Sequence, residues 1–136
     1  MQATPSSGFL YLVASLQRPS STHIFILEGE RAERSDVASA IASHLGRQLR
    51  VISKDEDWKS WIASIPKPDQ ENWILLFDGA DALFGKRTSV QDSHEKYADL
   101  NSSFDGLIFL GVSRSYVLPT AFTQCAKTIM ADHYSS

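Results

Sequence analysis

One acidic residue, Asp78, is the strongest candidate for chemistry in this sequence, because it directly follows five apolar residues, Trp73 to Phe77. A short, unbroken apolar run that ends at an acid is typical of a strand buried on both faces. Ligands of open parallel sheets bind at the carboxyl ends of the strands, so Asp78 is placed where a carboxylate could hold Mg²⁺ through water. The alternative is structural, with the Asp78 side chain capping a nearby turn or loop.

A second candidate is the turn Gly29 to Ser35, which follows the predicted strand His23 to Leu27 and precedes a predicted helix. A phosphate-binding loop in this position needs glycines whose N–H groups surround the phosphates, a lysine that neutralises them and a hydroxyl that binds Mg²⁺. Here only Gly29 supplies a glycine, and Arg34 and Ser35 would replace the lysine and the hydroxyl residue in a loop one residue too short.

Two acids in the same turn argue against a bound phosphate. Glu30 and Glu33 would place negative charge beside it. Two like charges about 4 Å apart repel by about 4 kcal/mol at an effective dielectric constant near 20. Arg34 could restore part of the lost phosphate affinity. Without the second glycine, however, the loop is not expected to place its backbone N–H groups around a phosphate.

The residues after Asp78 carry a family resemblance. The string G-A-D-A-L-F-G-K-R-T, from Gly79 to Thr88, resembles the Walker B region of AAA+ ATPases, in which Asp-Glu precedes A-D-A-L-F-G-K-R. The match is close from Ala80 to Arg87, and the wider resemblance covers residues 23–130. It departs at Gly79, where the family has a second acid that polarises the attacking water. Glycine has no side chain that could orient a water or accept its proton.

The resemblance also implies a polar sensor and two arginine fingers, and all three are altered. Ser113 stands where the family has asparagine, and Gln124 and Cys125 stand where it has arginines. An arginine finger contributes roughly 10³–10⁵ in rate in related phosphoryl-transfer systems. We therefore expect no catalytic residues, no resident cofactor and no metal, unless Asp78 meets a magnesium nucleotide. The residues of the vestigial nucleotide site would be Gly29, Arg34, Ser35, Asp78 and Ser113.

The function that follows from this resemblance is a pseudo-ATPase domain that acts through protein–protein contacts. Its partner would be an active AAA+ ATPase or a second copy of the chain as a homo-oligomer. The alternative is residual ATP or ADP binding with magnesium, or weak ATPase activity, through Arg34, Ser35 and Asp78. A shortened remnant without a fixed activity is a third, blander interpretation.

The elements that must position these residues follow an alternating pattern, which predicts an α/β fold in which helices cover both faces of a parallel sheet. The predicted strands are 23–27, 49–52, 73–77, 106–112 and 127–130, and the predicted helices include 36–45, ended by Gly46, and 55–65. The resemblance implies a three-layer αβα sandwich with a five-stranded sheet in the order 5-1-4-3-2. It also implies a missing helix before the fourth strand, with only Leu100 to Asp105 in that gap. The helical lid after the last strand is expected to be absent, because the sequence stops at Ser136.

Several segments and side chains have simpler interpretations. Residues 9–16 could form a strand or a short buried helix, and residues 88–93 are expected to be an exposed loop. Trp58 and Trp61 are expected to pack a helix on the sheet, with an exposed aromatic patch as the alternative. Cys125 is expected to be a small buried residue. The four histidines, His23, His44, His94 and His133, lack metal-ligand spacing.

Composition limits the broad class of the protein. The 136 residues are enough for one domain, 1–136, and 43% hydrophobic with 21% charged residues is ordinary for a globular protein. The net charge of −3 gives no electrostatic reason to expect binding to nucleic acid or an anionic membrane. We expect neither a signal peptide nor a membrane span. A single cysteine cannot form an internal disulfide, which favours a reducing cytoplasm.

Overall fold

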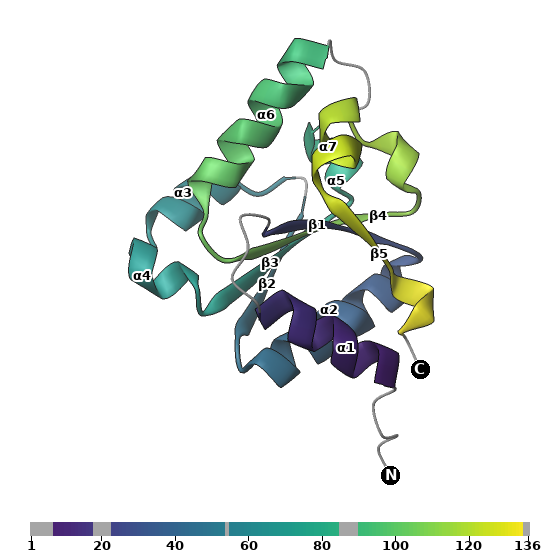
Figure 1. The fold of residues 1–136 in the computed structure, drawn as a ribbon. Coiled ribbons are helices and arrows are strands. Elements are labelled where there is room, and N and C mark those ends of the chain that lie inside the picture. Colours follow the sequence, from purple (N-terminus) through teal and green to yellow (C-terminus); the bar gives the residue numbers. More distant parts are fainter. Residues whose placement is uncertain (1–6, 18–22, 54, 85–89, 135–136) are drawn as a thin grey trace.

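A parallel sheet of five strands lies between two layers of helices (Figure 1). The computed structural model describes residues 7–17, 23–53, 55–84 and 90–134. The strands are β1 (Ile24–Glu28), β2 (Gln48–Ile52), β3 (Trp73–Asp78), β4 (Leu107–Val112) and β5 (Lys127–Met130). Their order in the sheet is β2-β3-β4-β1-β5. This is the predicted order 5-1-4-3-2 viewed from the other edge, so the predicted three-layer α/β architecture is confirmed.

Two helices cover one face of the sheet, and the remaining α-helices cover the other face (Figure 1). The first layer contains α1 (Ser7–Gln17) and α2 (Arg31–Leu45). The second layer contains α3 (Trp58–Ala63), α4 (Lys67–Gln70), α5 (Ala80–Phe84), α6 (Val90–Ser103) and α7 (Thr120–Cys125). Two short 3-10 helices, η1 (Ser115–Val117) and η2 (Ala131–His133), follow β4 and β5.

Strand β3 shows why the apolar run in the middle of the sequence predicts this architecture. Ile74 and Leu76 are buried against the α1 and α2 layer, while Leu75 and Phe77 are buried in the opposite layer. Alternate residues of a strand point to opposite faces, so every position of this run is apolar because both faces are covered.

The N-terminal apolar segment, residues 9–16, is a helix outside the sheet. Phe9, Val13 and Leu16 are its buried residues and lie on one side of α1 against α2. Their spacing of four and three residues is helical, which removes the strand alternative.

The exposed loop predicted for residues 88–93 is wrong where the structure describes it. Thr88 and Ser89 lie outside the described residues, and α6 begins at Val90. Ser93 is buried, and its hydroxyl oxygen accepts a hydrogen bond from the Ala121 N–H at 3.3 Å. The polar residues of this segment suggest a loop, but Ser93 lies in the interface between α6 and α7. The helix then continues through Leu100 to Ser103, which the resemblance places in a gap.

Two other local predictions are confirmed. Gly46 caps α2 in the left-handed conformation, with φ of 65°, which glycine adopts without steric cost. The Trp58 and Trp61 rings are partly buried and make edge contacts with Phe77 at 5.3 Å and Trp73 at 5.1 Å between ring centroids. These contacts join α3 to the sheet as predicted.

Candidate functional site

Asp78 lies at the carboxyl end of β3, and both of its oxygens are engaged by arginines. Arg34 Nη2 donates to Oδ1 at 2.7 Å, and Arg31 Nε lies 3.0 Å from Oδ2. The Arg34 side chain is only 7% exposed and that of Asp78 15%, whereas that of Arg31 is 84% exposed. Charge-assisted bonds of this length are the stronger class of hydrogen bond. The carboxylate that is a candidate for magnesium is therefore neutralised by the chain's own side chains.

Arg34 reaches Asp78 across the end of the sheet. Its Nη1 donates to the Gly29 carbonyl oxygen at 2.9 Å, which fixes the turn after β1. Its Nε is buried without a hydrogen-bond partner and lies over Gly111 in β4. A Cβ at Gly111 would stand 3.1 Å from this nitrogen, so the absence of a side chain there leaves the space that the guanidinium fills.

The predicted phosphate-loop turn, Gly29 to Ser35, is wrong in its local structure. Helix α2 begins at Arg31, so only Gly29 and Glu30 separate it from β1. A two-residue connection cannot surround a phosphate with backbone N–H groups in the way that a longer glycine-rich loop does. Arg34 consequently lies in the first turn of the helix, where it points back to Asp78.

The N-terminus of α2 is already capped. The Glu30 side chain accepts a hydrogen bond from the Glu33 backbone N–H, and the Glu33 Oε1 accepts one from the Glu30 N–H at 3.1 Å. This reciprocal arrangement satisfies N–H groups that would otherwise bind an anion. Two carboxylates thus occupy the end of the helix dipole that a phosphate would need.

A hollow of about 350 Å³ lies beside this helix end and is unsuited to an anion. It is lined by Glu28, Gly29, Glu30, Glu33, Arg114, Met130 and Asp132. Four of these residues carry carboxylates and one carries a guanidinium. A phosphate chain entering the hollow would meet like charges on most sides.

Of the five predicted site residues, the structure brings three together. Gly29, Arg34 and Asp78 are joined by the hydrogen bonds of the guanidinium. Ser35 and Ser113 are exposed, and none of the contacts found within the described residues connects either side chain to Asp78. The carbonyl of Ser113 accepts a hydrogen bond from Arg114 Nη1 at 3.0 Å.

Arg31 is the site residue that the sequence does not point to. The resemblance places it inside a loop, whereas it is the first residue of α2. Position N1 of that helix lies one turn before Arg34, so both arginines face the same carboxylate. The signal that could reveal it is the Glu30-x-x-Glu33 capping pair, which indicates a helix start at this point.

Gly79 stands where the resemblance expects a second acid. Its backbone conformation disfavours any residue that has a side chain. Its φ is +74°, in the left-handed region that residues with a Cβ rarely adopt. Its N–H donates to the Gly111 carbonyl at 3.0 Å, and its own carbonyl accepts from Ala82 N–H at 3.0 Å. These bonds hold the turn from β3 into α5. The backbone at this position is therefore specialised for a tight turn.

The string after Gly79 that carries the family resemblance packs into the core. Ala80 is fully buried, and Phe84 lies 5.5 Å from Phe77 and 5.2 Å from Phe122 between ring centroids. Aromatic pairs at such distances stabilise a fold beyond the area they bury. Gly85 to Arg87, which complete the resemblance, lie outside the described residues.

Gln124 and Cys125, at the positions that the resemblance assigns to arginine fingers, lie at the end of α7. The expectation that Cys125 is buried is wrong: it is exposed, because the buried side of this short helix is formed by Ala121 and Phe122. Burial raises the pKa of Tyr97 on α6, and the nearby Cys125 thiolate raises it further. The Tyr97 ring packs edge-on against Phe122 at 5.4 Å between centroids.

Within the described residues, no group of three or more His, Cys, Asp or Glu side chains is arranged to hold a metal ion. None of the helices in that part of the chain combines the length and the apolar content needed to cross a bilayer. Neither a scan against protein-family models nor a search of curated proteins finds a match to this chain.

Proposed function

We propose that this chain is a catalytically inactive AAA+-like domain that acts by contact with another protein and does not use a nucleotide. The observation that carries the proposal is the buried bond from Arg34 to Asp78. In an active relative, an acid at this rim would help to hold magnesium. Here it is bound to two guanidinium groups.

The residues present do not fit a magnesium nucleotide. Magnesium would have to replace the guanidinium groups on Asp78, and removing one partner of a buried pair typically costs about 3–5 kcal/mol. The phosphates would have to replace the carboxylates that cap α2 and would enter a hollow lined by four acids. Both replacements oppose the binding of a magnesium nucleotide, so we assign no reaction to one.

Support for a contact function comes from the outward side of α1. This helix contains no charged residue, and its Leu10 and Tyr11 side chains are exposed, with Tyr11 71% accessible. Adjacent exposed apolar and aromatic side chains are common at protein interfaces. The first partner to test is a second copy of the chain.

Two experiments test the proposal. The first measures phosphate release from ATP by the purified chain with magnesium, with Asp78→Ala as the comparison. We expect no release above background from either protein. Release by the wild type that Asp78→Ala abolishes would overturn the claim of inactivity.

The second experiment is sedimentation velocity over a wide concentration range, comparing the wild type with Tyr11→Lys. We expect concentration-dependent association that the substitution weakens. Val51→Lys, which charges another exposed apolar residue on the edge strand β2, is the matched control and should leave association unchanged. A wild-type chain that stays monomeric at the highest concentration would exclude the second copy as the partner.

The alternative function, expected from the sequence at Arg34, Ser35 and Asp78, is a weak anion or nucleotide site, and the structure joins two of these residues, Arg34 and Asp78. One observation favours it, namely that Arg31 is exposed beside Asp78 and presents a cation to solvent. Calorimetry with ATP and ADP separates this alternative from the first proposal.

A further inference from the structure

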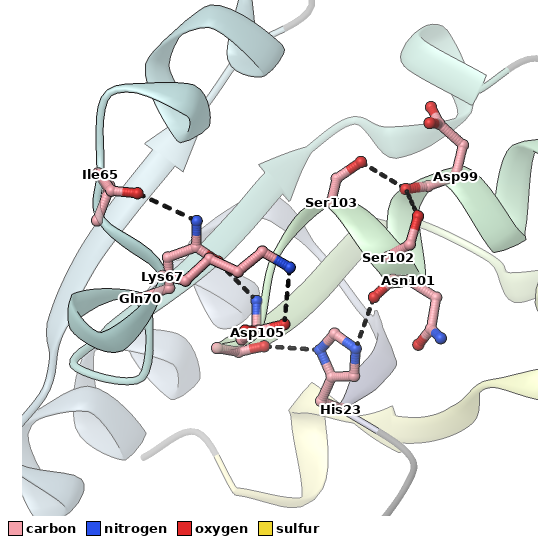
Figure 2. Close-up of polar contacts among 10 residues, drawn as sticks. His23, Ile65, Lys67, Gln70, Asp99, Asn101, Ser102, Ser103 and Asp105 are labelled. Atoms are coloured by element: carbon pink, nitrogen blue, oxygen red, sulfur yellow. Dashed lines mark hydrogen bonds and ion pairs between the residues drawn. The ribbon is translucent and has the colours of Figure 1, made fainter.

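His23, just before β1, has a carbonyl oxygen opposite each of its two ring nitrogens. Nδ1 lies 2.7 Å from the Gly106 carbonyl oxygen, and Nε2 lies 3.1 Å from that of Asn101 (Figure 2). Gly106 directly precedes β4, and Asn101 is in the last turn of α6. One half-buried imidazole therefore connects three elements at the amino-terminal edge of the sheet.

The chemistry of the ring makes this arrangement depend on a proton. A carbonyl oxygen can only accept a hydrogen bond, and a neutral imidazole carries one N–H, so it can donate to one of the two oxygens. Its other nitrogen then directs a lone pair at an acceptor. The imidazolium carries two N–H groups and donates to both oxygens. We propose that His23 is a proton-operated clamp, which joins α6 to β4 when it is charged and releases one of them when it is neutral.

The end of α6 favours the charged form. The last four carbonyl groups of a helix have no partner within the helix, and Asn101 supplies one of them. The last turn of α6 contains no basic residue of its own. A cation at a helix C-terminus is stabilised by the helix dipole. A charged His23, which directly precedes β1, would supply that cation.

The acceptors are held in place, so they cannot easily turn away from a neutral ring. A Cβ at Gly106 would lie 2.3 Å from the Gln70 carbonyl, which shows how closely the two backbones approach. The Gln70 side chain also accepts from the Asp105 N–H at 2.9 Å and donates to the Ile65 carbonyl at 3.3 Å (Figure 2). The His23 carbonyl accepts from the Ile108 N–H at 2.9 Å, which fixes the strand that carries the ring.

Asp105 and Asp99, which stand next to Gly106 and two residues before Asn101 in the chain, are each paired with a lysine. Asp105 lies 4.0 Å from Lys67 on α4. Asp99 on α6 lies 2.7 Å from Lys59 on α3. On the other side of β1, Lys127 of β5 stands opposite Phe25 in the strand register. Within the described residues, the two carbonyl oxygens are thus the hydrogen-bond partners found for the ring.

The sign of the pH dependence follows because only the charged ring can donate hydrogen bonds to both carbonyl oxygens. Such a group stabilises the fold at low pH, and this contribution is lost as the pH rises. Histidine ordinarily changes charge between about pH 5 and pH 8. The clamp should therefore hold while the ring is charged and loosen when it is neutral.

The experiment compares urea unfolding of the wild type and His23→Gln at pH 5.5 and pH 8. The quantity is the ratio of the unfolding equilibrium constant of the variant to that of the wild type. We expect this ratio to be about tenfold larger at pH 5.5, as for one added charge-assisted hydrogen bond. His94→Gln, at an exposed position on α6, is the control and should give a ratio near one at both pH values. Equal ratios for His23→Gln at the two pH values would overturn the proposal.

A second measurement needs no variant and decides the matter if His23→Gln does not fold. Long-range ¹H–¹⁵N correlation spectra of the folded wild type show which ring nitrogens carry protons. At pH 5.5 we expect both His23 nitrogens to be protonated, and at pH 8 we expect one. Faster amide exchange of Ile108 at pH 8, after correction for the intrinsic rate, should accompany the loss. A single neutral tautomer at pH 5.5 would refute the clamp.

Discussion

The guanidinium of Arg34 donates to the Asp78 carboxylate at 2.7 Å, although the two residues are 44 positions apart in the chain. The contact joins the first turn of α2 to the end of β3, across the rim where ligands of parallel sheets bind. This end of the sheet is therefore held by an ion pair between two of the chain's own side chains. The same side chain also binds the Gly29 carbonyl, so the turn after β1 depends on it.

This pair should be important for stability. Asp78→Ala leaves Arg34 buried with an unbalanced charge, and we expect it to lower the free energy of unfolding by about 3 kcal/mol. Arg34→Met should cost a similar amount, and the double variant should cost less than the sum, because the two residues share one interaction. Urea unfolding of all four proteins measures the coupling.

The exposed pair of Lys59 and Asp99 provides the control for that cycle. Its atoms are also 2.7 Å apart, but both side chains are more than half exposed. Replacing either residue by alanine should change the free energy of unfolding by less than about 1 kcal/mol. Coupling in the Arg34 and Asp78 cycle no larger than this would contradict a structural role for the buried pair.

Introducing an acid at Gly79 should not create an ATPase. The left-handed backbone there makes any residue with a Cβ unfavourable, and a Cβ added at this position would meet no atom within 4 Å, so no clash adds to the strain. We therefore expect Gly79→Glu and Gly79→Ala to lose about the same stability, roughly 1–2 kcal/mol. Thermal unfolding and an assay of phosphate release check both parts. Activity in Gly79→Glu, or a much smaller loss in that variant, would show that this interpretation is wrong.

The string from Ala80 to Phe84 should matter for folding. Phe84→Ala removes a buried ring that contacts Phe77 and Phe122, so we expect a loss of about 3–5 kcal/mol. Tyr11→Ala, which truncates an exposed aromatic residue, should change stability by less than about 0.5 kcal/mol. Chemical unfolding of the two variants compares the buried and exposed positions, and similar losses would contradict the packing role.

Tyr97 should make the fold sensitive to alkali. Burial, together with the Cys125 thiolate, raises the pKa of its hydroxyl above the ordinary value. A tyrosine whose pKa is raised by folding favours the folded state below about pH 10 and loses this contribution as the pH rises through that value. Tyr97→Phe should therefore be less sensitive than the wild type between about pH 9 and pH 11. Equal slopes of unfolding free energy against pH for the two proteins would rule out this role for Tyr97.

Much of the sheet can be predicted because its strands are buried on both faces. A continuous apolar run such as Ile74 to Phe77, bounded by polar residues and turns, indicates a buried strand in a chain of this size. The place of Asp78 at the end of β3 follows from the same pattern. Gly46 is equally informative, because a glycine after a helical run is the usual way to end a helix.

The start of α2 cannot be predicted correctly from a comparison of Gly29 to Ser35 with a phosphate loop. The residues Arg31 to Arg34 have good helix propensity, and the capping pair supplies the local signal. The charged residues before Asp36 and the helical apolar spacing after it place the predicted helix start at Asp36, whereas α2 begins at Arg31. The bond between Arg34 and Asp78 depends on this helix start and on the space over Gly111, neither of which a linear pattern reveals.

The His23 clamp cannot be predicted from the sequence either, because its partners are distant in the chain. Metal-ligand spacing tests histidines against one another, and His23 has no histidine neighbour in the sequence. Its partners are backbone carbonyl groups at separations of 83 and 78 positions. The parallel pairing of β1 with β4 brings His23 beside Gly106, and Asn101 lies in α6, which ends shortly before β4.

Isothermal titration calorimetry of the purified wild type with ATP and ADP, each with magnesium, tests most directly whether the rim is closed to nucleotides. We predict no saturable heat for either nucleotide up to millimolar concentration. Saturable binding with a dissociation constant in the micromolar range, abolished by Arg34→Ala and by Asp78→Ala in variants that remain folded, would contradict a closed rim.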